Sequence, residues 1–333
     1  KCRLIYVTDG KYRRKVKEDS MKNKAPRKKP AVNRVYYIYV GILAVLFFTF
    51  HTIPFLKGVM YSFTDWRGYG EWNFVGLRNY IHMFSDVDTG NAYLFTFKFA
   101  VITTILVNVI SLILACALNA KIKFKNTIKA FYFLPYMLGS LIVGFIFNYI
   151  FANLIPQLGK GLGIKALSVN ILGTNHAIWG IVAVSVWIGC AFNTLIYIAG
   201  LQSIDTDVYE AADLDGCNGI QRFFYITLPM IRPILAYTLI TSIIGGLQMF
   251  DVPQILTNGQ GNPDRTSMTL IMFLNSHLKS KNYGMAGSLS VYLFIVSAIL
   301  CFFVYRMTND NDPDGSKKAA KKRAKEERRR ARS

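Results

Sequence analysis

Long apolar stretches separated by short polar segments make up most of this chain. Six of them are long enough to cross a bilayer as helices, which takes about 20 residues each. They run Val35–Leu56, Tyr93–Leu118, Ala130–Phe151, His176–Leu201, Pro233–Phe250 and Met285–Tyr305. Lys98 is the one charged residue inside these stretches, and a lysine near a helix end extends its ammonium to the interface. The pattern predicts an all-α, polytopic membrane protein with six transmembrane helices.

Prolines and glycines divide the third stretch from the fourth. Segment 152–175 contains Pro156, Gly159, Gly161 and Gly163, a composition typical of a loop. Within the third stretch, Pro135 removes a helix hydrogen bond. It predicts either a bend that acts as a gate or a kink without function.

The net charge of +20 is concentrated at the two ends. Residues 1–34 hold 13 Lys and Arg against 3 acids, and residues 306–333 hold 11 against 5. An even number of spans places both ends on one side, and an excess of basic residues marks the cytoplasmic side. We expect basic cytoplasmic tails at 1–34 and 307–333 in the cell membrane, and external segments at 57–92, 152–175 and 251–284.

The basic tails allow two interpretations, a topology signal that contacts anionic lipid or a nucleic-acid-binding segment. Tyr6 and Tyr12 are the only aromatic residues in the two tails, and this scarcity favours the lipid interpretation. No nucleic-acid partner is predicted.

Sequence signatures of catalysis are missing. With 52% hydrophobic and 17% charged residues, the composition excludes an ordinary soluble enzyme. No Walker or other phosphate-binding motif occurs, and none of the five cysteines forms a CxxC pair, so no cofactor and no metal site are predicted. Because the six stretches contain no Asp, Glu or Arg, a proton or sodium relay lacks its usual groups. This disfavours a secondary carrier that works alone, which remains an alternative.

The polar segment Gln202–Ile231 begins with five carboxylates and then becomes apolar. Asp207, with Glu210 three residues later, predicts a capping box for a helix that runs to Leu214 and stops at Gly216. A second helix is expected over Ile220–Thr227, ending before Pro229. Ala211 and Ala212 would give the first helix a face without bulk.

The same segment carries the most specific motif. Its residues are Glu210-Ala211-Ala212-x-x-Asp215-Gly216, then Phe223, Ile226, Leu228-Pro229 and Pro233. This run resembles the EAA loop of membrane subunits of binding-protein-dependent ABC importers; Cys217, where alanine is usual, departs from it. The resemblance implies that 202–231 is a coupling loop seated in a cleft of a cytoplasmic ATPase. Glu210 would pair with a basic residue there, and Gly216 would permit the turn; Glu210 capping its own helix is the alternative.

Two flanking segments resemble carbohydrate permeases, in the branch of the maltose transporter's larger membrane subunit. They are Tyr61-Ser62-Phe63-Thr64-Asp65-Trp66 with Phe74-Val75-Gly76-Leu77-x-Asn79-Tyr80, and Phe250-Asp251 with Leu256-Thr257-Asn258-Gly259-x-Gly261-x-Pro263. The resemblance covers about residues 35–306. It implies a type I ABC importer permease fold, with a transmembrane domain at 93–306 preceded by a first helix and external segment at 35–92.

The resemblance also implies partners and a function. The chain would pair with a second homologous permease, a cytoplasmic ABC ATPase dimer and an extracytoplasmic sugar-binding protein. It would be a non-catalytic subunit that imports a sugar or oligosaccharide by ATP-driven alternating access. Glycerol phosphate or another polyol derivative is the alternative substrate, but an anion would be expected to need a basic group in the cavity.

A neutral sugar requires hydrogen-bonding groups and flat apolar faces, which spans four and five supply. The candidate pathway residues are Gly189, Phe192, Asn193, Ser242, Gly246 and Met249. By resemblance, Gly189 and Ser242 match sugar-site positions of the maltose permease, Phe192 replaces a tyrosine, and Gly246 and Met249 replace asparagines. Small residues in membrane helices also serve helix packing, and the partner permease could hold the substrate contacts instead.

Overall fold

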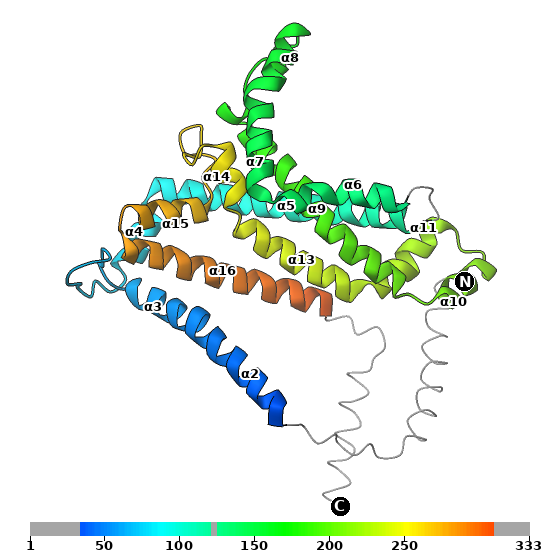
Figure 1. Ribbon diagram of the computed structural model, residues 1–333, viewed down its shortest axis with the longest axis horizontal. Helices are drawn as coiled ribbons and strands as arrows, with labels where there is room; N and C mark the ends of the chain where they lie inside the picture. The colour runs from blue at the N-terminus through cyan, green and yellow to red at the C-terminus, as the bar shows by residue number, and fades with distance from the viewer. Residues whose placement is uncertain (1–33, 121–124, 310–333) are drawn as a thin grey trace, which may run out of the picture. The chain divides into compact units, whose positions relative to one another are not determined.

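The computed structural model describes residues 34–120 and 125–309, which are mostly helical (Figure 1). Within these ranges the one β contact is an isolated antiparallel bridge between Thr64 and Phe74. Most of both expected tails, 1–33 and 310–333, lies outside the described residues.

The α-helices are α2 Arg34–Phe47, α3 Ile53–Tyr61, α4 Arg78–Ser85, α5 Val87–Asn119, α6 Lys125–Leu138, α7 Ser140–Tyr149, α8 Ile155–Gly161, α9 Ala177–Gln202, α10 Thr206–Leu214, α11 Gly219–Arg222, α12 Leu228–Met230, α13 Arg232–Leu247, α14 Asp251–Leu256, α15 Leu270–Lys279 and α16 Tyr283–Asn309. Shorter turns are the π-helical η1 Phe48–Thr52, η2 Ile150–Leu154 and η5 Phe223–Thr227 and the 3-10 turns η3 Lys165–Leu167 and η4 Ile171–Gly173.

Six helical segments are long and apolar enough to cross a membrane, as the sequence predicts. They are Tyr37–Tyr61, Val87–Asn119, Ser140–Gly161, Ala177–Gln202, Arg232–Leu256 and Tyr283–Met307. Each overlaps one predicted stretch. The all-α, six-span prediction is therefore confirmed.

The third span differs from its prediction because Gly139 interrupts the helix. Gly139 has φ +79°, a backbone conformation that glycine adopts at little cost, and it separates α6 from α7. Helix α6 runs through position 135, so the break lies four residues after the proline that was expected to bend the span.

The following helix also extends into the predicted loop. Helix continues through η2 and α8 to Gly161, and Pro156 lies in the first turn of α8, where a missing N–H costs little. Gly159 faces the backbone of Leu167 so closely that a side chain would not fit. The loop expected to begin at residue 152 is therefore helical in its first part.

The chain forms two compact units whose division falls inside α9, α13 and α16. The larger unit contains residues 34–198 and 238–301, and the smaller contains 199–237 and 302–309. Two apolar clusters hold the larger unit together. One joins α5, α7, α9 and α14 through Phe99, Val143, Ile181, Val184 and Val252. The other joins α4, α5, α15 and α16 through Met83, Ala100, Leu270, Met272 and Leu289.

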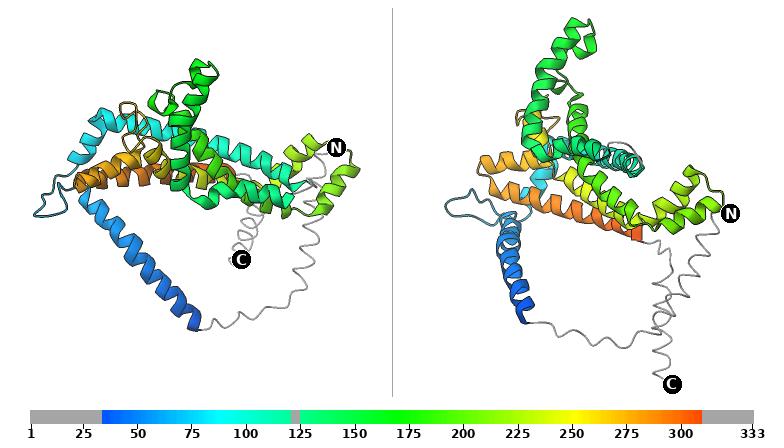
Figure 2. Two further views of the ribbon diagram at one scale, coloured as in Figure 1. Left: turned by 45° about the horizontal axis from the view of Figure 1, so that its top comes forward. Right: turned by 45° about the vertical axis from the view of Figure 1, so that its right-hand side comes forward.

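Helix α7 packs along α14, as both views in Figure 2 show. The Asn148 side-chain amide donates to the carbonyl oxygens of Ile255 (3.1 Å) and Leu256 (3.2 Å) at the end of α14. At the other end of the contact, the Ser140 hydroxyl donates to the Asp251 carboxylate at 2.7 Å. The two Asn148 bonds satisfy carbonyls that a helix C-terminus leaves without internal partners.

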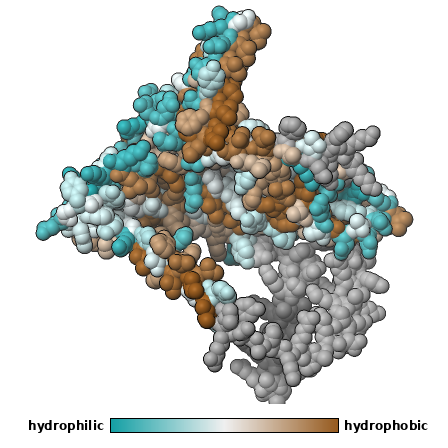
Figure 3. All heavy atoms as spheres, viewed as in Figure 1, coloured by the Kyte–Doolittle hydropathy of each residue, from teal (hydrophilic) through white to brown (hydrophobic). Residues whose placement is uncertain are grey.

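The segment α2–α3 packs on the rest of the larger unit only near its C-terminal end. The Phe55 and Phe294 rings lie 4.9 Å apart, and Gly284 and Gly287 of α16 allow close approach to the backbone of Thr64 and Gly58. From Tyr37 to Leu56 nearly every side chain is exposed, and Figure 3 shows an apolar surface there and along α7–α8. Such surfaces require lipid or a partner protein.

Candidate functional site

The segment 202–231 folds as two short helices within the smaller unit. The first, α10, begins at Thr206, with Asp205 in extended conformation at the N-cap. Asp207 therefore lies inside the first turn, where its charge favours the helix dipole, and the predicted Asp207–Glu210 capping box is wrong. The predicted end of the helix at Leu214 is confirmed.

Gly216 ends α10 in the way that its position predicts. It has φ +72°; its N–H donates to the Asp213 carbonyl at 3.1 Å, and the Cys217 N–H donates to the Ala212 carbonyl at 3.0 Å. This pair of bonds is a Schellman motif. It ends α10 and begins the turn that leads to the next helix at Gly219.

The second helix has the capping box that was expected for the first. The Gln221 N–H donates to Asn218 Oδ1 at 2.8 Å, and the Asn218 N–H donates to Gln221 Oε1 at 3.1 Å. The helix then continues through η5 into α12, so its predicted end before Pro229 is wrong. Because η5 is a π turn, Pro229 falls in the first turn of α12, where it is tolerated.

A guanidinium and two hydroxyls hold the two helices together. Arg222 Nη1 lies 2.8 Å from Asp213 Oδ1, and its guanidinium carbon is 5.6 Å from the centre of the Tyr209 ring. The Tyr209 and Thr227 hydroxyls lie 3.1 Å apart. These contacts join α10 to α11 and η5 across the turn at Gly216.

The exposed face of α10 carries acidic, small and apolar residues in one row. Asp207, Glu210, Ala211 and Leu214 follow helical i, i+3, i+4 and i+7 spacing, and all are exposed. Leu214 is 90% exposed. We call these four residues the α10 face. Ala212 is fully buried, so the prediction that it helps to present an open surface is wrong.

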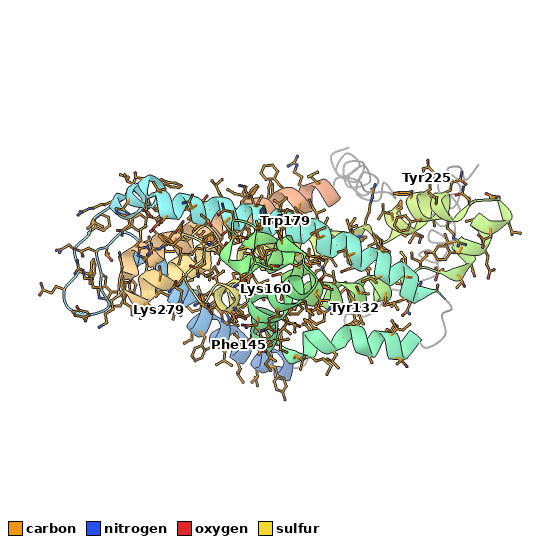
Figure 4. The ribbon with its side chains drawn as sticks, turned by 90° about the horizontal axis from the view of Figure 1, so that it is seen from above. Tyr132, Phe145, Lys160, Trp179, Tyr225 and Lys279 are labelled. Carbon is orange, nitrogen blue, oxygen red and sulfur yellow. The ribbon has the colours of Figure 1, made fainter. Side chains whose placement is uncertain are left out.

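Large apolar side chains are also exposed beyond the turn. Asp215 and Gly216 are exposed, and so is Ile220 on the next helix, at 72%. Tyr225 on η5 is labelled in Figure 4 and is 51% exposed. Exposed apolar residues mixed with carboxylates are typical of a protein docking surface.

The larger unit joins two of the pathway candidates in a hydrogen-bond network. Asn193 of α9 donates its amide to Ser242 Oγ of α13 at 2.9 Å, and Asn108 of α5 donates to the same oxygen at 3.1 Å. The Tyr197 hydroxyl donates to Asn108 Oδ1 at 2.7 Å and lies 2.6 Å from Thr238 Oγ1. We call these five residues the α5–α9–α13 network.

Four of the five network residues are closed to solvent. Tyr197 and Thr238 are 0% exposed, Asn108 and Asn193 are 5% exposed, and Ser242 is partly exposed. The sequence reasoning missed Asn108, Tyr197 and Thr238. Asn108 could have been noticed as an amide in the middle of an apolar stretch, where an unpaired polar group is costly.

The candidate glycines lie at helix contacts. A Cβ on Gly246 would lie 2.9 Å from Ala100 Cα of α5, and one on Gly189 would lie 3.3 Å from a Val107 methyl carbon. Both positions therefore serve close helix packing. Met249 is half-buried beside the first apolar cluster, and its carbonyl accepts a hydrogen bond from Thr269 Oγ1 at 3.0 Å.

Phe192 is the one pathway candidate with an exposed aromatic side chain. It is 39% exposed and stacks on Tyr136 of α6 with ring centres 5.7 Å apart. Trp187, one turn earlier on α9 and 41% exposed, meets the Phe147 ring edge-on at 5.3 Å. The two ring pairs are separate: one joins α9 to α6 and the other joins α9 to α7.

Lys98 is exposed on α5, one turn from the exposed Leu94 and Val101. It therefore lies away from the buried α5–α9–α13 network. Among the described residues, no three His, Cys, Asp or Glu side chains gather closely enough to hold a metal ion.

Comparison with known proteins identifies relatives over most of the chain. Residues 107–313 match the family described as "Binding-protein-dependent transport system inner membrane component". The multiple sugar-binding transport system permease protein MsmF of Streptococcus mutans is 37% identical over 261 residues, covering 78% of this chain and 89% of that protein. A probable starch degradation products transport system permease protein, AmyD of Thermoanaerobacterium thermosulfurigenes, is 30% identical, covering 83% and 94%.

Solved structures show the same fold. A bacterial ABC transporter involved in the import of the acidic polysaccharide alginate contains a chain that matches with a TM-score of 0.73 and 19% identity, covering 84% of this chain and 97% of that chain. The same kind of transporter in complex with a periplasmic protein that holds an alginate pentasaccharide matches with a TM-score of 0.71 and 18% identity. At this identity the likeness concerns the fold.

Proposed function

The chain belongs to the family of binding-protein-dependent transport system inner membrane components, and on this premise we propose that it is the permease subunit of an ATP-driven importer for a sugar or oligosaccharide. Its relatives are named as permeases for sugars and starch products. The subunit is non-catalytic, and a separate ATPase would hydrolyse ATP. Membership in this family disfavours the secondary carrier that works alone.

The α10 face carries the coupling part of this proposal. It is an exposed row of carboxylate, methyl and isobutyl groups that ends in a tight turn at Gly216. A cleft on an ATPase with basic and apolar walls would complement it, with Glu210 supplying the charge and Ala211 permitting close approach. Movement of the two ATPase subunits would reach the spans through the helices that flank the loop, α9 and α13, and alternate the access of the pathway.

Charge reversal at Glu210 tests this coupling. In the assembled transporter, Glu210→Lys should insert normally but lose most of both sugar uptake and sugar-stimulated ATP hydrolysis, because the lysine repels a basic partner. Glu71→Lys, at an exposed acidic position outside the loop, is the matched control and should retain both. Unchanged uptake and hydrolysis in an intact Glu210→Lys complex would contradict the proposed role.

A neutral sugar is the substrate class that we propose. Within the α5–α9–α13 network, the partly exposed Ser242 offers a hydroxyl, and the Phe192–Tyr136 and Trp187 rings offer apolar faces of the kind that sugars stack on. Lys98 lies on an exposed side of α5, which gives no support to glycerol phosphate. If Lys98→Met abolished uptake, the anionic alternative would be favoured.

Partners and orientation follow from the same proposal. An extracytoplasmic sugar-binding protein would deliver the substrate, and a second homologous permease would complete the pathway. Two ATPase subunits would dock on the cytoplasmic side, one of them at 202–231. Both termini would then lie in the cytoplasm, on the same side as the α10 face, because each pair of spans returns the chain to that side.

A further inference from the structure

Helix α4 and the residue before it, Leu77, have three distinct sides. With 3.6 residues per turn, Asn79, Tyr80 and Met83 share one side, and Met83 is completely buried. A second side carries Leu77, Ile81 and Phe84, which are 62%, 65% and 65% exposed. The third carries Arg78, His82 and Ser85, all exposed. We call the second side the apolar side of α4 and the third its polar side.

Hydrogen bonds fix α4 to the end of the first span. The Asn79 amide donates to the carbonyl oxygens of Ser62 (2.9 Å) and Thr64 (2.8 Å), and the Tyr80 hydroxyl lies 2.7 Å from Ser62 Oγ. The candidate span ends at Tyr61, directly before these residues. Helix α4 is therefore held at the level where that span leaves the bilayer.

The apolar side continues into residues that face outward at the start of the second span. Val87 and Leu94 of α5 are 76% and 60% exposed. Before α4, Trp72 and Tyr69 are 46% and 67% exposed, and such aromatic residues are typical of the membrane interface. A helix with an exposed apolar side next to an exposed polar side that carries an arginine, at this depth, has the properties of a helix that lies on a membrane.

We propose that α4 is an interfacial helix that lies on the bilayer surface where α3 ends. Leu77, Ile81 and Phe84 enter the acyl region, and Arg78 meets the phosphates of lipid headgroups. The helix thereby ties the ends of the first two spans to the bilayer surface. This inference concerns lipid contact and does not depend on which solute the importer carries.

Spin labels can test which medium covers each side of α4. Single cysteines at Leu77, Ile81, Phe84, Arg78, His82 and Ser85 are labelled in a variant without native cysteines. The assembled transporter is placed in nanodiscs of phosphatidylethanolamine and phosphatidylglycerol. Collision of each label with oxygen, which concentrates in lipid, is compared with collision with a water-soluble nickel chelate. Retained sugar-stimulated ATP hydrolysis identifies the labelled variants that remain folded.

The proposal expects labels at positions 77, 81 and 84 to collide severalfold more with oxygen than with nickel, and labels at 82 and 85 to show the reverse preference. Dominant nickel collision at 81 and 84 would mean that the apolar side faces water and would overturn the proposal. Weak collision with both reagents would mean that a protein covers this side, which would overturn it equally.

Discussion

At the scale of single residues, the α5–α9–α13 network shows why two polar side chains of spans four and five lie where they do. Asn193 and Ser242 are among the groups that a sugar pathway requires, but they bond to each other and to Asn108. Ser242 Oγ accepts from both amides, so it is the shared point of contact of three helices. The sequence identified the residue types, and the packing decided their partners.

Removal of one hydroxyl from the network should destabilise the protein. Tyr197→Phe takes the donor away from Asn108 Oδ1, which is buried, and such a loss costs about 1–2 kcal/mol. We expect a lower midpoint of thermal unfolding in detergent. Tyr39→Phe, at a residue that is 64% exposed, is the control and should leave the midpoint unchanged. Equal midpoints for wild type and Tyr197→Phe would show that the bond adds nothing.

Gly245 and Gly246, adjacent on α13, allow a matched test of helix packing, because a side chain would meet α5 at only one of the two positions. Gly246→Ala places a methyl group 2.9 Å from Ala100 Cα, and such overpacking costs about 1–3 kcal/mol. A Cβ on Gly245 would meet nothing within 4 Å, so Gly245→Ala should be neutral or stabilising by up to about 1 kcal/mol. Thermal unfolding of the two variants measures the difference. If they unfolded alike, the close contact with α5 would not constrain position 246.

At the scale of elements, three π turns and one glycine determine where helices bend and break. Pro135 and Pro229 were expected to bend or end helices, yet the break falls at Gly139 and the helix around Pro229 continues after η5. Pro229 is accommodated because it lies where its missing N–H goes unused and its ring avoids the carbonyl four residues earlier. A π turn or a helix start supplies such a position, and sequence periodicity does not reveal either.

The turn at Gly216 should require glycine. An alanine with φ near +72° is strained by about 1–2 kcal/mol, so Gly216→Ala should shift the loop or lower its stability. Sugar-stimulated ATP hydrolysis should fall while the amount of inserted protein stays similar. Gly219→Ala is the control, because a Cβ there meets nothing within 4 Å. Full stimulated activity in Gly216→Ala would show that coupling tolerates a different turn.

At the scale of the whole molecule, α2–α3 and α7–α8 each leave a large apolar surface exposed, which the other described residues of this chain do not bury. In Figure 3 they form apolar surfaces on the larger unit. Some of this area faces lipid. Under the proposed function, a second permease would cover the rest.

Gentle purification from native membranes should therefore yield a complex. We expect mass spectrometry of the eluate to find a second six-span permease and an ABC ATPase together with this chain. A co-eluting solute-binding protein would identify the substrate through its own ligand. An intact chain that elutes alone and transports solute after reconstitution would contradict the importer assignment and favour a secondary carrier.

The sequence by itself determined the helical class, the number of spans, the position of the 202–231 loop and the family. These follow from apolar stretch length and from a local motif, which depend on residues close together in the chain. Tertiary structure alone decided that Ala212 is buried, that Gly139 breaks the third span, and that Asn108 and Tyr197 join Asn193 and Ser242. The hydrogen bonds depend on which distant helix lies alongside, because a bond across 49 or 134 positions leaves no periodic trace in the sequence.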